Sequence, residues 1–137
     1  MAKTVDEAMT RDPRTVTPQT TIAEAARHMR DDDVGLLPVV EGDRLVGTIT
    51  DRDIAVRVVA EGRGPDTTVA DVASRELVTI DPQQDLDEAM RLMAEHQVRR
   101  LPVCEEDGRL VGIVAQADVA RHGSDEHAGE TVERISR

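Results

Sequence analysis

The sequence has no phenylalanine, tyrosine or tryptophan, and Cys104 is its single cysteine. Without aromatic side chains, the core must be built from Leu, Ile, Val, Ala and Met, which fill space well. Surfaces that bind single-stranded nucleic acids usually stack the bases on aromatic rings, and this chain has none. A single cysteine also excludes an intrachain disulfide, which suits a reducing compartment.

Basic residues are in short supply as well. The 17 Lys and Arg residues stand against 28 Asp and Glu residues, which gives a formal net charge of -11. Phosphate backbones are attracted to basic patches, so this charge argues against a nucleic-acid partner. No apolar run approaches the roughly 20 residues of a membrane-spanning helix, and the N-terminus does not resemble a secretory signal. We therefore expect a cytoplasmic protein without a membrane partner.

The most informative feature that is present is an internal repeat. At an offset of 64 positions, residues 4–41 match residues 68–105 at 15 of 38 positions. After a one-residue insertion in the second copy, residues 44–55 match residues 109–120 at 6 of 12 positions. The chain is therefore a tandem duplication. Its predicted parts are a first repeat over 4–60, a polar linker over 61–67, a second repeat over 68–122 and a polar tail over 123–137.

Each repeat has the pattern of a β-α-β-β-α unit. Helical spacing of apolar residues follows a capping signature, Thr21-x-x-Glu24 in the first copy and Asp85-x-x-Glu88 in the second. A last helix is expected to begin near Asp51 in the first copy and near Gln116 in the second. The predicted strands are 15–17, 36–40 and 44–50 in the first copy, and 78–80, 100–104 and 109–115 in the second.

One repeat alone is a poor folding unit. About 60 residues bury too little surface to cover both faces of a three-stranded sheet with two helices. Packing the repeats against each other through their sheets would complete a core. The sequence therefore predicts an α/β (α+β) fold with pseudo-two-fold symmetry and two clefts between the repeats. Any apolar surface left on the helices would pair two such modules into a homodimer.

These segments resemble the tandem cystathionine-β-synthase (CBS) domain family over residues 4–121. The resemblance rests on the order of the elements, the opening segment Thr4–Met9, the strand Leu37-Pro38-Val39 and the run Leu45–Ile54. The sequence is most similar to stand-alone bacterial members of the hypoxic-response type. The resemblance implies a regulatory module that binds AMP, ATP or S-adenosylmethionine in its clefts, with AMP or ATP preferred. It also implies a homodimer that signals to a protein partner by conformational change, and no enzymatic activity.

The family motif Gly-h-h-Thr/Ser-x-x-Asp, with h apolar, falls on Gly47–Asp53. By resemblance, Asp53 would accept hydrogen bonds from a ribose diol, while Thr50, Arg52 and the free N–H groups of a helix N-terminus would bind phosphate. The adenine would lie between two strands, against Thr15, Val16, Thr17, Leu36, Leu37 and Pro38. The pair Thr50-x-x-Asp53 is also a capping box, which begins many helices that bind no ligand. Both interpretations stay open at this point.

The second copy of the motif is altered. It keeps the acid as Asp118 but has Ala115 where the first copy has a hydroxyl. Arg100, which stands where the first copy has Leu36 at the start of the preceding strand, could bind phosphate in compensation. Such an arginine could equally be solvated or paired with an acid. We therefore expect two unequal sites, the first being the stronger.

Other polar residues are weaker candidates. The tail residues His122, Asp125, Glu126 and His127 lack a cysteine partner and a tight frame, so no metal site is predicted. Cys104 aligns with Val40 and should be a small buried apolar side chain. No catalytic constellation is evident. The alternative to a ligand sensor is a structural dimerisation module whose sites have degenerated.

One acidic run is unexpected. Asp31, Asp32 and Asp33 close a predicted helix, where the negative end of the helix dipole disfavours acids. An arginine supplied across a dimer would explain them.

Overall fold

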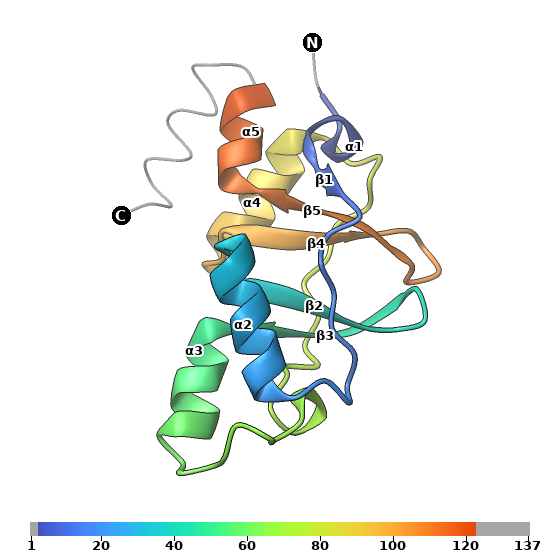
Figure 1. Cartoon of the computed structure of the whole chain (residues 1–137). Helices are drawn as coiled ribbons and strands as arrows, with labels where there is room; N and C mark the ends of the chain where they lie inside the picture. The colour runs from blue at the N-terminus through green and yellow to red at the C-terminus, as the bar shows by residue number, and fades with distance from the viewer. Residues whose placement is uncertain (1–2, 123–137) are drawn as a thin grey trace. The chain divides into compact units, whose positions relative to one another are not determined.

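The computed structural model describes residues 3–122, which form two compact units (Figure 1). The central unit is Arg14–Leu77. The terminal unit joins the segment that ends at Pro13 to the segment that begins at Val78. The sequence repeats begin about ten residues earlier than this division, so each compact unit takes its opening segment from the other copy.

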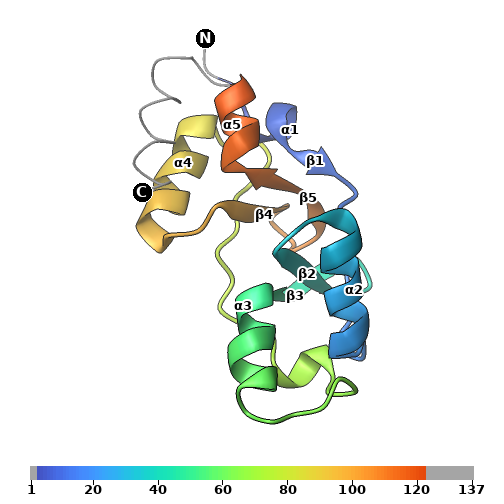
Figure 2. The same ribbon diagram turned by 60° about the vertical axis from the view of Figure 1, so that its left-hand side comes forward.

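Both units contain a helix, a β-hairpin and a second helix in that order, as the sequence predicts (Figures 1 and 2). The central unit consists of α2 (Ile22–Asp32), β2 (Leu36–Glu41), β3 (Arg44–Thr50), α3 (Asp51–Ile54), the π-helical turn Ala55–Val59 and the 3-10 turn Val69–Asp71. The terminal unit consists of α1 (Val5–Ala8), β1 (Thr10–Arg11), α4 (Leu86–His96), β4 (Arg100–Cys104), β5 (Leu110–Ala115) and α5 (Gln116–His122). Over the described residues, none of these helices has the length and apolar character to cross a membrane.

The two hairpins have the same register. Leu36 lies opposite Thr50 in the β2–β3 pair, and Arg100 lies opposite Ala115 in the β4–β5 pair. Each hairpin also has an irregularity at the equivalent place, after Val39 in one and after Val103 in the other. The structure thus keeps the internal repeat in its backbone detail.

The predicted strands at 15–17 and 78–80 are reduced to single bridges. Val16 pairs in parallel with Val39, and Ile80 pairs in parallel with Val103. The Thr17 N–H turns to the Thr20 hydroxyl at 3.0 Å instead of extending the ladder. A proline follows each segment and has no N–H to donate to a neighbouring strand, so both segments are shorter than expected.

Residues 61–67, predicted as a polar linker, supply part of the cap of α2. The first N–H groups of a helix have no partner within it and need acceptors from outside. Ile22 donates its N–H to the Thr67 carbonyl at 2.8 Å, and Ala23 donates to the Pro65 carbonyl at 3.0 Å. The linker thereby belongs to the fold of the central unit.

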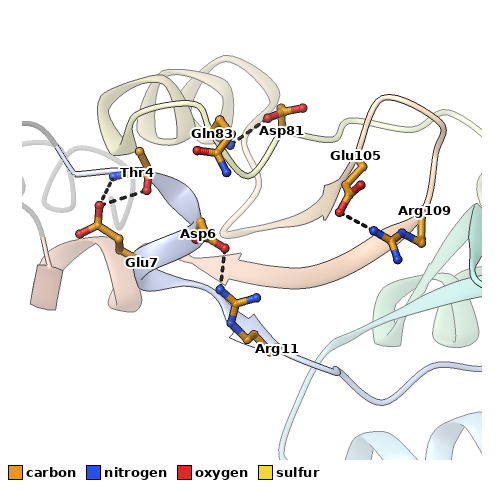
Figure 3. Close-up of polar contacts among 8 residues, drawn as sticks. All are labelled: Thr4, Asp6, Glu7, Arg11, Asp81, Gln83, Glu105 and Arg109. Carbon is orange, nitrogen blue, oxygen red and sulfur yellow. Dashed lines mark hydrogen bonds and ion pairs between the residues drawn. The ribbon is translucent and has the colours of Figure 1, made fainter.

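The N-terminal segment has the same role in the terminal unit. Leu86, the first residue of α4, donates its N–H to the Lys3 carbonyl at 2.9 Å, and Val5 donates to the Gln84 carbonyl at 2.8 Å. The segment then adds β1 to the edge of β5. Within this N-terminal segment, Thr4 is hydrogen-bonded to Glu7, and Arg11 is hydrogen-bonded to Asp6 (Figure 3).

The helix starts agree with their capping signatures. The Thr21 hydroxyl accepts the Glu24 N–H at 3.2 Å, and the Asp85 carboxylate accepts the Glu88 N–H at 3.0 Å. Short polar side chains at this position satisfy an N–H group that the helix leaves unpaired.

Two of the three acids at the end of α2 pair with arginines of the same unit. The Arg14 guanidinium donates to the Asp32 carboxylate, and this hydrogen bond lowers the pKa of Asp32. Arg30 pairs with Asp31 at 2.9 Å. Asp33 adopts the left-handed conformation that ends the helix, with φ of 55°.

Each unit has its own aliphatic core. The opening segments contribute Val69 to the central core and Val5 to the terminal core, and both side chains are fully buried. The central core consists of Val16, Ile22, Ala25, Met29, Leu37, Val39, Ile49, Val58, Val69 and Val72. The terminal core consists of Val5, Ala8, Ile80, Leu86, Ala89, Met90, Met93, Leu101, Val103, Val114 and Val119.

Val5 and Val69 occupy equivalent positions and provide a matched test of this arrangement. Replacing either with alanine should cost roughly 2 kcal/mol, because two buried methyl groups are lost and a cavity is left. Val5→Ala should speed native-state amide hydrogen exchange mainly in residues 78–122, and Val69→Ala mainly in residues 14–63. Faster exchange of the central unit in Val5→Ala would contradict the division into units.

Candidate functional site

The predicted site residues of the first copy lie in the central unit, where β3 runs into α3. The Thr50 hydroxyl accepts the Asp53 N–H at 3.0 Å, and the Asp53 carboxylate accepts the Thr50 N–H at 2.9 Å. The capping box is therefore formed. Because Leu36 pairs with Thr50 across the hairpin, it lies beside this turn.

The residues expected to surround the adenine are only partly accessible. The Val16 N–H donates to the Pro38 carbonyl at 3.0 Å, and its carbonyl accepts the Val40 N–H at 2.9 Å. The side chains of Val16, Leu37 and Pro38 are buried. Thr15, Thr17 and Leu36 remain at least partly exposed and are the residues of this group that a ligand can reach.

The helix N-terminus does not present free N–H groups, contrary to expectation. Asp51 donates its N–H to the Gly35 carbonyl at 3.0 Å, and Arg52 donates its N–H to the Asp51 carboxylate at 2.8 Å. The Asp53 N–H is taken by Thr50. A Cβ atom on Gly35 would lie 3.1 Å from Asp51 Oδ2, so glycine permits this close approach. A phosphate at this turn would have to displace contacts that the fold already makes.

Three groups at this turn are still available. Asp53 is partly exposed, its Oδ2 accepts the Thr50 N–H, and within residues 3–122 it has no further hydrogen-bond or ion-pair partner. The Thr50 hydroxyl accepts one bond and keeps its own proton to donate. The Arg52 guanidinium is exposed and makes no ion pair with the described residues. The turn can therefore accept hydrogen bonds from a diol and offer one hydroxyl and one positive charge.

In the equivalent turn of the terminal unit, both carboxylate oxygens of the acid have partners. The Ala115 N–H donates to the Asp118 carboxylate at 3.0 Å, and the other carboxylate oxygen binds the Arg121 guanidinium. Asp118 is the buried charged residue of the described chain, at 8% exposure. Arg100 lies opposite Ala115 and, over residues 3–122, makes no ion pair. Sequence analysis had not singled out Arg121, although its spacing of three residues from Asp118 on a helix was visible.

A hollow of about 230 Å³ lies elsewhere in the central unit and was also missed. It lies against the middle of the β2–β3 hairpin, near the pair formed by Val39 and Gly47. A Cβ atom on Gly47 would lie 2.9 Å from the Ser74 carbonyl oxygen, so the glycine allows the neighbouring segment to come close. The lining residues are Pro18, Val39, Glu41, Val46, Gly47, Ala70, Ala73 and Arg75.

No metal site is found in the part of the chain that the structure describes. Of the tail residues considered for such a site, Asp125, Glu126 and His127 lie outside the described residues, and His122 is the last residue of α5.

The CBS domain sequence profile matches residues 5–60 and 69–125. The chain belongs to the CBS-domain family. The CBS pair is 47% identical over 133 residues to the CBS domain-containing protein YhcV of Bacillus subtilis, which covers 96% of this chain and 94% of YhcV. It is 45% identical over 104 residues to hypoxic response protein 1 of Mycobacterium tuberculosis, which covers 74% of this chain and 72% of that protein.

Solved structures of other CBS proteins have the same fold. A crystal structure of hypoxic response protein I with two coordinated zinc ions has a TM-score of 0.82 at 40% identity, and it covers 89% of this chain and 100% of that chain. CBSX2 in complex with AMP has a TM-score of 0.77 at 26% identity, covering 98% of both chains. The CBS domain pair of MJ0100, in complex with 5-methylthioadenosine and S-adenosyl-L-methionine, has a TM-score of 0.80 at 26% identity. The match covers 95% of this chain and 99% of that chain.

YhcV and hypoxic response protein 1, which this CBS pair matches along most of their length, are stand-alone CBS proteins without a catalytic domain. It also matches an inosine-5'-monophosphate dehydrogenase of Korarchaeum cryptofilum at 37% identity, but over only 25% of that enzyme. The comparisons therefore place the chain among non-catalytic CBS pairs.

Cys104 of this CBS pair is buried at 8% exposure, as the sequence predicts. Burial raises the pKa of its thiol from 9.0 to about 11. The thiolate is the reactive form, so the folded protein should react with a disulfide reagent at pH 8 only slowly. The reaction should become fast in urea, and rapid modification without urea would contradict the burial.

The same shift predicts a dependence of stability on pH. Because the pKa of Cys104 is higher in the folded state, its contribution to stability is complete below about pH 9 and is lost as the pH rises towards about 11. The chain has no tyrosine, so no phenol group adds to this change. Denaturant unfolding should therefore show a steeper alkaline loss of stability in the native protein than in Cys104→Ala. Parallel curves for the two proteins would contradict this account.

Proposed function

We propose that this CBS pair is a regulatory module that binds an adenosine-containing ligand at the turn formed by Thr50 and Asp53. The observation that carries the proposal is the Asp53 carboxylate, which is held in place by the Thr50 N–H and keeps one oxygen unpaired among the described residues. The complexes of CBSX2 with AMP and of MJ0100 with S-adenosyl-L-methionine support this choice of ligand.

The geometry suits the nucleoside part of such a ligand. An ionised carboxylate makes stronger hydrogen bonds than a neutral acceptor, and its two oxygens suit the two hydroxyls of a ribose. The fold fixes the Asp53 side chain before binding, so little side-chain entropy remains to be lost. Leu36, Thr15 and Thr17 are the accessible neighbours for the base.

The turn is less suited to a long phosphate tail. Its first-turn N–H groups are taken, and the exposed carboxylate of Asp51 would repel an anion. Arg52 is the nearest cation in the sequence, and the Thr50 hydroxyl is the nearest neutral donor. We therefore expect the adenosine moiety to supply most of the affinity, so that AMP and S-adenosylmethionine bind comparably and ATP gains little from its additional phosphates.

Ligand binding is expected to stabilise the folded protein. At about 100 times the dissociation constant, a ligand that binds only the folded state adds roughly 2.7 kcal/mol, which raises Tm by several degrees in a domain of this size. The protein should show this shift with AMP or S-adenosylmethionine in calorimetry or circular dichroism, which do not need aromatic side chains. Failure of every adenosine compound at millimolar concentration would reject the proposal.

The role of Asp53 has a specific test. Asp53→Ala should remove most of the ligand-induced shift, because the ribose loses its acceptor. This variant also loses the acceptor of the Thr50 N–H, so each shift is measured against the variant's own Tm without ligand. Asp43→Ala removes an equal charge from an exposed turn and should keep the full shift. Equal shifts in both variants would exclude Asp53 from the site.

A ligand-independent dimerisation module is the second candidate function. It is favoured by the exposed apolar side chains of Val56 and Val59, at 48% and 70% exposure, on the turn that continues α3. This function predicts a homodimer by light scattering that Val59→Asp converts to a monomer and that adenosine compounds leave unchanged in stability. A monomer at micromolar concentration would reject it.

A further inference from the structure

We infer that Arg121 closes the second copy of the site by occupying Asp118, so that each chain binds one adenosine ligand, at the turn of the central unit. This inference rests on the proposed function and assigns a stoichiometry and a specificity-determining residue to it.

In both turns the acid accepts the N–H of the residue three positions before it, but only the second turn adds an ionic contact to the acid. Asp53 accepts the Thr50 N–H at 2.9 Å, and Asp118 accepts the Ala115 N–H at 3.0 Å. The second oxygen of Asp118 is bound by the Arg121 guanidinium, whereas Asp53 has no such partner among the described residues. The carboxylate that would receive a ribose diol is therefore engaged on both oxygens in the second copy.

The difference comes from the side chain three residues after each acid. Residues at this spacing on a helix are neighbours on its surface. Position 121 has an arginine, while the equivalent position of the first copy has Val56, which cannot pair with a carboxylate. The acidic residue is present in both copies, and only the second copy supplies it with a counter-ion.

Burial makes this contact costly to break. The Asp118 side chain is 12% exposed, and a buried charge that loses its partner pays for its desolvation. A diol is neutral, so it would replace an ion pair between two charged groups by hydrogen bonds in which only the carboxylate is charged. Arg121 itself is 70% exposed, so its pairing is partly screened, and we expect the pairing to weaken ligand binding at the second copy by at least about tenfold, which leaves one tight site per chain. The missing hydroxyl at Ala115 weakens the same site further.

The opposite role for Arg121 would be to help bind a phosphate. Its guanidinium is accessible, but it donates to Asp118, and that pairing neutralises the charge a phosphate would use. In that case, removal of Arg121 would lower the affinity for AMP. Our inference predicts that its removal raises the affinity.

Isothermal titration calorimetry on the full chain, with AMP and with S-adenosylmethionine as probes, separates these outcomes. The native protein should bind one ligand per chain, and Asp53→Ala should abolish the binding. The double variant Ala115→Thr with Arg121→Val restores the hydroxyl and removes the counter-ion of Asp118, and it should bind two ligands per chain. The additional site should disappear when Asp118→Ala is added.

Exchange in the other direction is the matched control. Val56→Arg places an arginine three residues after Asp53 and should weaken the first site by about tenfold. Light scattering and circular dichroism establish that this variant keeps its assembly and fold. Ala115→Thr alone, which leaves Arg121 in place, should still bind one ligand.

Two results would overturn the inference while leaving the proposed function intact. One is a native protein that binds two ligands, of which Asp118→Ala removes one. The other is a double variant that still binds one ligand, together with a Val56→Arg variant whose affinity is unchanged. Absence of any binding to the native protein would reject the proposed function and this inference together.

Discussion

The first-turn N–H groups of α2 and α4 need acceptors that these helices cannot supply themselves, and this requirement organises the molecule. The carbonyls of Thr67 and Lys3 meet it, and each comes from a segment that precedes the other sequence repeat. The same segments add an edge to each sheet and a fully buried valine to each core. A duplicated chain thereby becomes two units that each depend on both copies.

A second constraint, the cap of the helix that follows β3 or β5, creates the candidate site. A carboxylate three residues into the helix accepts the N–H at its start in both units. This cap orients the acid and leaves one oxygen for another partner. In the central unit that oxygen has no partner among the described residues, and in the terminal unit Arg121 takes it. A structural cap and a ligand site are therefore compatible, because they use different oxygens of one side chain.

Much of the fold could be predicted because it depends on patterns between residues close in sequence. Thr21 and Asp85 mark their helix starts by side-chain chemistry, and the hairpins follow from alternating apolar residues and turn residues. The length of the strand at 15–17 could not be predicted in this way, because a strand forms only where a neighbouring strand lies within hydrogen-bonding distance. The partner of Asp32 is Arg14, which is 18 residues away in the sequence, so no local pattern could predict this ion pair.

The sequence alone determined the duplication, the family, the helix starts and the loss of the hydroxyl at position 115, since each depends on residue identity and short spacing. Only the tertiary structure decided which segment completes which unit. It also decided that the first-turn N–H groups of α3 are occupied, and that Asp118 is buried and paired with Arg121 while Asp53 keeps an oxygen unpaired among the described residues. The physical reason is that hydrogen-bond partners and burial depend on which parts of the chain come together, and spacing along the chain does not specify this.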